Sequence, residues 1–308
     1  MKTETVPSMN IKKAKNNREL HKFKDILGSY LFVLPALSFL FLFSIVPIIY
    51  LIWLSFTDYS LPNPAVFIGL ENFSRMLEDK LFLKSIFNTL VYTFGSMALG
   101  LVFALAIAVL LNRQLKGLRI FKVFYFLPTI TSEVITAMIF LWVFDNNLGI
   151  LNYLLKVLGM ENPPAWLLEP TTAMLILIFI GAWRGAAYNT PIFLAALQSV
   201  PQSYYEAARL DGANAWKQFI HISLPSITHM LVYSMVMSVI GSFQVVAVVD
   251  ILTNGGPMDS TMVAIKHIWQ QSFEFNYVGY GASLSLVLFP FLLLITWLQL
   301  KLSSRKES

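Results

Sequence analysis

The sequence has 308 residues, of which 56% are hydrophobic and 13% are charged. An ordinary soluble domain carries about 25% charged residues, so this composition is typical of a chain that spends most of its length in lipid. The net charge of +5 does not indicate nucleic-acid binding, because the charges cluster at the ends of apolar runs, and the absence of cysteine excludes disulfides and thiolate metal sites.

Residues 1–29 form a polar, basic segment that we expect to be a solvated cytoplasmic tail. It does not match a cleavable signal peptide, because the apolar run that follows is too long and lacks a small-residue cleavage site. We assign residues 30–301 to one transmembrane domain and residues 302–308 to a short C-terminal cytoplasmic tail.

Six apolar stretches are long enough to cross about 30 Å of hydrocarbon, which takes roughly 20 residues. The predicted fold is therefore an all-α membrane protein with six transmembrane helices. Proline inside such a helix is tolerated where neighbouring helices satisfy the freed carbonyl groups. The six predicted spans are Tyr30–Leu54, Ile86–Leu111, Val123–Phe144, Thr172–Leu197, Ile227–Val249 and Tyr280–Leu300.

The distribution of Lys and Arg predicts the orientation of the spans. Sixteen of the 22 lie in the N-terminal tail, in the loops 112–122 and 198–226, and at the C-terminal end, whereas five lie in the alternate segments. Cytoplasmic loops carry the excess of positive charge, so both termini and the loop 201–226 are predicted to be cytoplasmic.

The loop 201–226 between spans four and five reads locally as helix, break, helix. Ser203 and Glu206 have the spacing of a capping box, and Gly212 suits the left-handed turn that ends a helix. A second short helix is predicted from about Ala213 to Ile222, with Pro225 stopping it before the next span. By propensity alone, this segment is either a membrane-surface hairpin or a compact knob that another protein grips.

The residues of this loop carry a resemblance to a known family. The pattern Glu-Ala-Ala, three residues, Gly, nine residues, Ile-x-Leu-Pro is complete here, and it resembles the signature of the membrane subunits of binding-protein-dependent ABC importers. In that family the loop is a coupling helix that docks on a cytoplasmic ATPase. The resemblance therefore implies an ATPase-coupling role for Glu206, Ala207, Ala208, Asp211, Gly212, Ile222, Leu224 and Pro225.

Further stretches are similar to the carbohydrate branch of that family, the maltose and multiple-sugar permeases. They occur in the family's order, and the likeness covers roughly Tyr30 to Leu300. They are Leu197–Pro201, Ile240–Gln244 and Leu252–Pro257. The last contains the predicted tight turn Asn254-Gly255-Gly256-Pro257, which in the family faces a docked binding protein.

Charged side chains at bilayer depth cost at least about 2.5–3.5 kcal/mol each on insertion scales, so they need a reason. Glu133 in the third predicted span and Arg184 in the fourth are the two clear cases. Three arrangements are open: the two pair with each other, they line a water-filled cavity, or they lie near an interface and reach the headgroups.

A neutral sugar is held by hydroxyl and amide groups together with an apolar platform, so uncharged polar residues in the spans are candidates for a substrate pathway. The resemblance places Gly185, Tyr188, Ser238 and Ser242 at pocket positions and Glu133 near one; Gln244 is added for its chemistry, and Arg184 for its charge. The serines have an alternative, which is bonding to carbonyls of their own helix. An arginine in the pocket would suit an acidic sugar or a sugar phosphate.

The sequence contains neither a phosphate-binding P-loop nor histidines at metal-ligand spacing, so we expect no cofactor, metal or catalytic site in this chain. The resemblance implies a multi-pass permease of the bacterial inner membrane, surrounded by lipid. Its implied partners are a second permease, two ATP-binding subunits that carry ATP and Mg²⁺, and an extracytoplasmic solute-binding protein. Two other classes stay open: a membrane-embedded transferase acting on lipid-linked sugar, built on Asp145, Asp250 and Glu133, and a structural subunit without a pathway.

Overall fold

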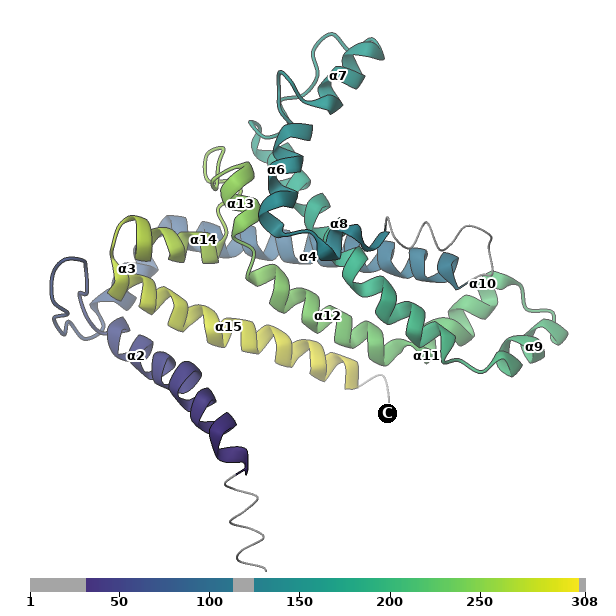
Figure 1. The fold of residues 1–308 in the computed structure, drawn as a ribbon, viewed down its shortest axis with the longest axis horizontal. Helices are drawn as coiled ribbons and strands as arrows, with labels where there is room; N and C mark the ends of the chain where they lie inside the picture. Colours follow the sequence, from purple (N-terminus) through teal and green to yellow (C-terminus); the bar gives the residue numbers. More distant parts are fainter. Residues whose placement is uncertain (1–31, 113–124, 305–308) are drawn as a thin grey trace, which may run out of the picture. The chain divides into compact units, whose positions relative to one another are not determined.

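The computed structural model describes residues 32–112 and 125–304. Its regular elements are helices, with two isolated bridges, Thr57–Phe67 and Ser60–Tyr277, in the loops (Figure 1). The predicted all-helical fold is therefore confirmed. The chain divides into two compact units, residues 1–54 and 55–308, which are described separately.

The described part of the first unit is an apolar helix, Phe32–Ser55, whose last residue lies one position past the unit's boundary. It covers most of the predicted first span, of which Tyr30 lies outside the described residues. Its middle turn, η1 (Phe41–Ile45), is a π-helix, and α2 (Val46–Ser55) follows. The amide of Val46 bonds to the carbonyl of Phe41, five residues back. Pro47 has no amide hydrogen, so the ladder of hydrogen bonds is already interrupted at this point.

The second unit is built on α4 (Lys80–Leu111) and α8 (Pro170–Gln198), which pack along each other (Figure 1). α12 (Thr228–Phe243) packs against α4, α8 and α15 (Val278–Ser304). α4, α8 and α15 are long and apolar enough to cross a membrane. They cover the predicted second, fourth and sixth spans.

Small residues bring α4 and α8 close together. A Cβ on Gly181 would lie 2.6 Å from the Tyr92 hydroxyl, and one on Gly100 would lie 3.1 Å from the carbonyl oxygen of Ala182. Gly185, by contrast, has open space at its Cβ position. Close helix approach in α8 therefore depends on Gly181, while Gly185 leaves room beside the helix.

α4 begins six residues before the predicted start at Ile86. The Asp79 side chain accepts a hydrogen bond from the Phe82 amide at 2.9 Å and caps the helix. Aspartate is a favoured N-cap because its oxygen satisfies an amide that has no partner within the helix. Hydropathy placed the start of this helix too late, because the charged residues Lys80 and Lys84 lie in its first turns.

The third predicted span, Val123–Phe144, is not one helix in the described residues. Residues 125–130 are helical, the helix is interrupted at Thr131–Ser132, and α6 (Glu133–Val143) then begins. The Thr131 side chain bonds back to the Leu127 carbonyl at 2.8 Å, which offers this turn an alternative to continuing the helix. Glu133 is therefore the first residue of a helix rather than a residue inside one.

The fifth predicted span, Ile227–Val249, is also interrupted. α12 ends at Phe243, and α13 (Ala247–Leu252) follows after a short break. Before α12 comes a continuous helical segment, Ala215–Ser226, which is bent by 67° from α12. If that bent pair is one span, the described residues contain five candidate spans; otherwise they contain four.

The segment Ala215–Ser226 consists of α10 (Ala215–Gln218), the π-helical turn η2 (Phe219–Ser223) and α11 (Leu224–Ser226). The helix was predicted to end near Ile222, before Pro225, but the helical segment runs through Pro225 and ends at Ser226. The short helix before it is α9 (Gln202–Leu210). The remaining elements are α3 (Glu71–Glu78), α7 (Ile150–Val157), α14 (Ala264–Trp269) and η3 (Gln270–Glu274).

Candidate functional site

A cavity of about 430 Å³ lies among α4, the start of α6, α8 and α12. Ligand sites in proteins typically measure about 300–1,000 Å³, so this volume is sufficient for a small ligand. All seven residues of the predicted pathway lie in its wall: Glu133, Arg184, Gly185, Tyr188, Ser238, Ser242 and Gln244.

Arg184 reaches from α8 to the beginning of α6. Its Nη2 lies 3.3 Å from Glu133 Oε1, and its Nη1 donates to Thr136 Oγ1 at 3.2 Å. The Arg184 side chain is 23% exposed and that of Glu133 is 50% exposed. Of the three arrangements left open by the sequence, the structure combines two: the charges pair with each other, and both line the cavity.

The uncharged polar residues of the wall contact one another across helices. Ser242 Oγ of α12 lies 3.4 Å from Ser96 Oγ of α4, and Asn189 Nδ2 of α8 lies 3.4 Å from Ser238 Oγ. The hydroxyls of Ser238 and Ser242 therefore lie between helices rather than on a lipid-facing surface.

Ser96 and Asn189 line the cavity but were missed by the sequence-based prediction of the pathway. Asn189 follows the predicted Tyr188 directly, so adjacency was a usable signal. Ser96 had no such signal, because serine in an apolar helix often bonds to its own backbone.

α9 carries the first half of the predicted coupling motif and begins without the expected capping box. Its N-cap is Pro201, no side chain caps it, and Ser203 lies inside the helix. The helix starts two residues earlier than the box requires because Pro201 sets the entry geometry. Glu206 and Ala207 are exposed, and Ala208 is half-buried.

The end of α9 agrees with the prediction. Asp211 is the C-cap, and Gly212 adopts φ +77°, a conformation in which glycine is favoured because it has no Cβ. Of the remaining motif positions, Asp211 and Pro225 are exposed, and Ile222 and Leu224 are half-buried. The exposed positions form a surface that another protein can reach.

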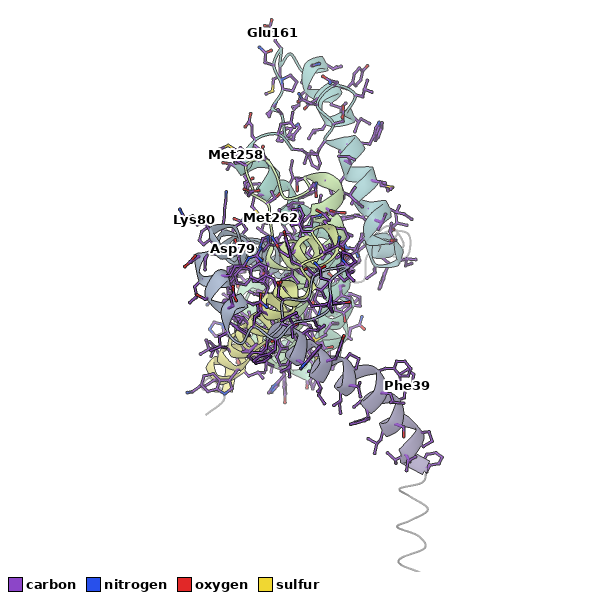
Figure 2. All side chains as sticks on the ribbon, turned by 90° about the vertical axis from the view of Figure 1, so that its left-hand side faces the viewer. Phe39, Asp79, Lys80, Glu161, Met258 and Met262 are labelled. Carbon is purple, nitrogen blue, oxygen red and sulfur yellow. The ribbon has the colours of Figure 1, made fainter. Side chains whose placement is uncertain are left out.

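The predicted docking turn Asn254–Pro257 lies between α13 and α14. Gly255 has φ +86° and is buried against Met262. The loop is anchored on α4, where Asn88 Nδ2 donates to the carbonyls of Asp259 at 2.9 Å and Met262 at 3.0 Å. Met258, 81% exposed, lies at the end of the loop (Figure 2).

Lys266 carries a buried charge, although by sequence it is one of the five Lys and Arg residues in the segments between the predicted cytoplasmic loops. Its side chain is fully buried, and its Nζ donates to Asp250 at 2.5 Å and to Glu274 at 3.1 Å. The Trp269 ring lies 4.6 Å from the same atom. This cluster joins α13, α14 and η3.

The carboxylates considered for a transferase site each have a separate environment. Glu133 pairs with Arg184, and Asp250 pairs with Lys266. Asp145 accepts hydrogen bonds from the amides of Leu148 and Asn147, which hold its pKa below the ordinary value. Among residues 32–112 and 125–304, no three His, Asp or Glu side chains gather in a way that would hold a metal.

Comparison with known proteins identifies the family. Residues 96–308 match the family described as "Binding-protein-dependent transport system inner membrane component". The chain is 35% identical over 308 residues to the arabinooligosaccharides transport system permease protein AraP of Bacillus subtilis (strain 168), covering 98% of this chain and 97% of the relative. It is 30% identical over 281 residues to the sn-glycerol-3-phosphate transport system permease protein UgpA of Yersinia pestis, covering 90% and 94%.

The fold is also that of a solved transporter. A chain in the crystal structure of a bacterial alginate ABC transporter, in complex with its alginate pentasaccharide-bound periplasmic protein, superposes with a TM-score of 0.82. The match covers 92% of this chain and 96% of that one, at 22% identity. The protein therefore belongs to the binding-protein-dependent ABC transporter permeases of the carbohydrate-uptake family, multi-pass inner-membrane subunits that are not themselves the ATPase.

Proposed function

We propose that this permease imports an uncharged saccharide and that the cavity among α4, α6, α8 and α12 is its half of the pathway. The observation that carries the proposal is the internal compensation of charge in the cavity wall. Arg184 is paired with Glu133, and the other polar residues that line the cavity are uncharged hydroxyl, amide or phenol groups. Such groups recognise sugar hydroxyls through hydrogen bonds.

An anionic substrate is the second candidate. UgpA is named for sn-glycerol-3-phosphate, and the solved transporter carries alginate, an acidic polysaccharide. The half-exposed Glu133 side chain favours this alternative, since its release would free the Arg184 guanidinium for a carboxylate or phosphate. A neutral substrate needs no such rearrangement, so we place it first.

We propose that α9 and the helical segment Ala215–Ser226 couple the pathway to a cytoplasmic ATPase. The coupling residues are exposed or half-buried on a loop that the distribution of Lys and Arg along the whole chain assigns to the cytoplasmic side. In this topology both termini are cytoplasmic, and six spans result when the broken third segment and the bent fifth one each cross once. Alternating access then requires the ATPase to grip α9 differently in its two nucleotide states, since equal contacts would shift nothing.

The proposed assembly contains a second, similar permease, two ATP-binding subunits and an extracytoplasmic binding protein. The family description and the periplasmic protein bound to the alginate transporter support the last of these. The loop around Asn254–Pro257 is our candidate docking site for it. Asn88 and Lys84 anchor this loop, and Met258 protrudes from it.

The test begins with the assembled transporter, purified through a tag on this chain. The binding protein is screened by thermal shift against maltotriose, arabinotriose, digalacturonate and glycerol 3-phosphate, and uptake of the best ligand is measured in proteoliposomes. We expect a neutral saccharide to stabilise the binding protein most, and Ser238→Ala with Ser242→Ala to slow its uptake. The control is Ser199→Ala, an exposed serine outside the cavity. Preference for an anionic ligand would favour the second candidate.

A further inference from the structure

A hydrogen bond ties α9 to the helical segment that follows it. The Tyr205 hydroxyl lies 3.0 Å from Ser223 Oγ, so two residues 18 positions apart bridge the turn at Gly212. Tyr205 is half-buried, whereas its neighbours Tyr204 and Glu206 are exposed. The Tyr205 side chain therefore points from α9 toward the membrane-proximal segment, while the motif residues beside it stay accessible.

Ser223 lies at a weak point of its own helix. It is 7% exposed and is the last residue of the π-helical turn η2, where the Leu224 amide bonds to the Phe219 carbonyl five residues back. Pro225 follows and has no amide to offer, so the ordinary ladder is broken on both sides of Ser223. A side-chain contact at this position fixes a turn that the backbone holds less firmly.

The segment that Ser223 belongs to leads directly to the cavity. It meets α12 at Ile227, a residue 1% exposed, where the helix bends by 67°. Ile227 packs in one cluster with Leu101 of α4 and Phe193 of α8. Eleven and fifteen positions further along the chain, Ser238 and Ser242 of α12 lie in the cavity wall. Tyr205 is thus linked to the cavity through its hydrogen bond to Ser223, the helical segment that ends at Ser226, and α12.

We propose that Tyr205 and Ser223 are positioning residues for transport, forming a latch through which displacement of α9 moves α12. Without the latch, α9 retains its backbone connections at Pro201 and Ala213, and these turns can flex independently of Ser223. The proposal rests on the proposed coupling role of α9. It adds a specific contact within this chain that passes that motion to the cavity.

The first experiment measures the motion of α12 without any transported ligand. The chain has no cysteine, so spin labels at Leu175→Cys on α8 and Met235→Cys on α12, both exposed, report their separation in the assembled transporter. Distances are compared without nucleotide and after trapping with Mg-ATP and vanadate. Loss of one hydrogen bond shifts an equilibrium roughly two- to tenfold. After trapping with Mg-ATP and vanadate, the ratio of molecules with α12 in the trapped position to molecules with α12 in the nucleotide-free position should therefore fall by that factor in Tyr205→Phe.

Matched variants separate the latch from general packing. Ser223→Ala should act like Tyr205→Phe, the double variant should be no worse than either single one, and Ser223→Thr should restore the motion. Ser226→Ala removes a hydroxyl that bonds within its own helix, to the Ile222 carbonyl at 2.6 Å, and should behave as wild type. Basal ATP hydrolysis and co-purification of the ATPase should persist in all variants. Additive effects of Tyr205→Phe and Ser223→Ala would overturn the latch.

A separate measurement distinguishes failure of the latch from failure of the coupling role. A cysteine at Leu210, 90% exposed at the end of α9, is tested for cross-linking to the ATPase. If it cross-links and Tyr205→Phe moves α12 as wild type does, the latch is wrong while the coupling role stands. If no cross-link forms, α9 does not contact the ATPase, and both proposals fail.

Discussion

The guanidinium of Arg184 lies 3.3 Å from the carboxylate of Glu133, and the two residues are 51 positions apart on α8 and α6. Their contact brings a unit of each charge into the cavity wall and cancels it there. The first turn of α6, which follows the break at Thr131–Ser132, places Glu133 and Thr136 within reach of one arginine.

Substitution of Glu133 should change which ligands the cavity accepts. Glu133→Gln leaves the half-buried Arg184 without its counter-ion, so we expect slower uptake of a neutral saccharide and a gain for an anionic one such as digalacturonate. The measurement is uptake of both by proteoliposomes under identical conditions. Glu161→Gln, an exposed change outside the cavity, serves as the control. If the ratio of the two uptake rates is unchanged, the Arg184–Glu133 ion pair does not determine substrate selectivity.

Alanine at two glycines should distinguish the helix contact from the cavity. Gly100→Ala places a methyl group 3.1 Å from the Ala182 carbonyl oxygen, whereas Gly185→Ala meets open space. Overpacking of this kind costs about 1–3 kcal/mol, so Gly100→Ala should lower the thermal unfolding temperature in detergent and Gly185→Ala should not. Equal unfolding temperatures in the two variants would contradict the close approach of α4 and α8.

The Lys266 cluster should stabilise the loops between α12 and α15. The double variant Asp250→Asn, Glu274→Gln removes both counter-ions of a fully buried ammonium group. Removing the partner of a buried charge costs about 3–5 kcal/mol, so the free energy of unfolding should fall by that order. Each single variant keeps one carboxylate, so its free energy of unfolding should fall clearly less than that of the double variant. If a single variant loses as much stability as the double one, the two carboxylates do not both stabilise Lys266.

Asp79 gives the protein a pH-dependent contribution to stability. Burial alone would raise its pKa, but hydrogen bonds from the Phe82 amide, Tyr280 and His267 bring the pKa below the ordinary value of 3.8. Because the folded state favours the carboxylate, this contribution is complete above about pH 3.8 and disappears as the pH falls through the lower folded-state pKa.

Asp79→Asn should therefore lower the unfolding temperature at pH 6, and its difference from wild type should narrow toward pH 3. Unfolding scans across this range provide the measurement, with the exposed Asp58→Asn as the control. If the difference in unfolding temperature between Asp79→Asn and wild type is the same at every pH, Asp79 stabilises the fold through packing and not through its charge.

The sequence predicted the parts of the fold that depend on hydrophobicity and on local backbone preference. Continuous apolar runs located α4, α8 and α15, and Gly212 marked the end of α9, because chain length in lipid and positive φ are properties of the residues themselves. The interruptions of spans three and five were not predictable in the same way. Both predicted spans stay apolar on average across Thr131 and Gln244, so mean hydropathy does not mark either break.

Contacts between distant residues account for what the sequence missed in the site. Composition identified Glu133 and Arg184 as costly charges, but their pairing depends on the packing of α6 against α8. Lys266 resembled an ordinary loop charge, because no local sequence pattern indicates that it pairs with Asp250 and Glu274. The capping box failed because Pro201 starts α9 earlier than Ser203 would.

The coupling role of the loop 201–226 is tested most directly by ATP hydrolysis in the reconstituted transporter, with and without its ligand-loaded binding protein. Glu206→Lys reverses the charge of an exposed α9 residue, and Gly212→Pro forbids the φ of +77° at the turn. Both variants should abolish stimulation by the loaded binding protein while the chain stays folded in the membrane, and Glu161→Lys should leave stimulation intact. Wild-type stimulation in both α9-loop variants would contradict the coupling role.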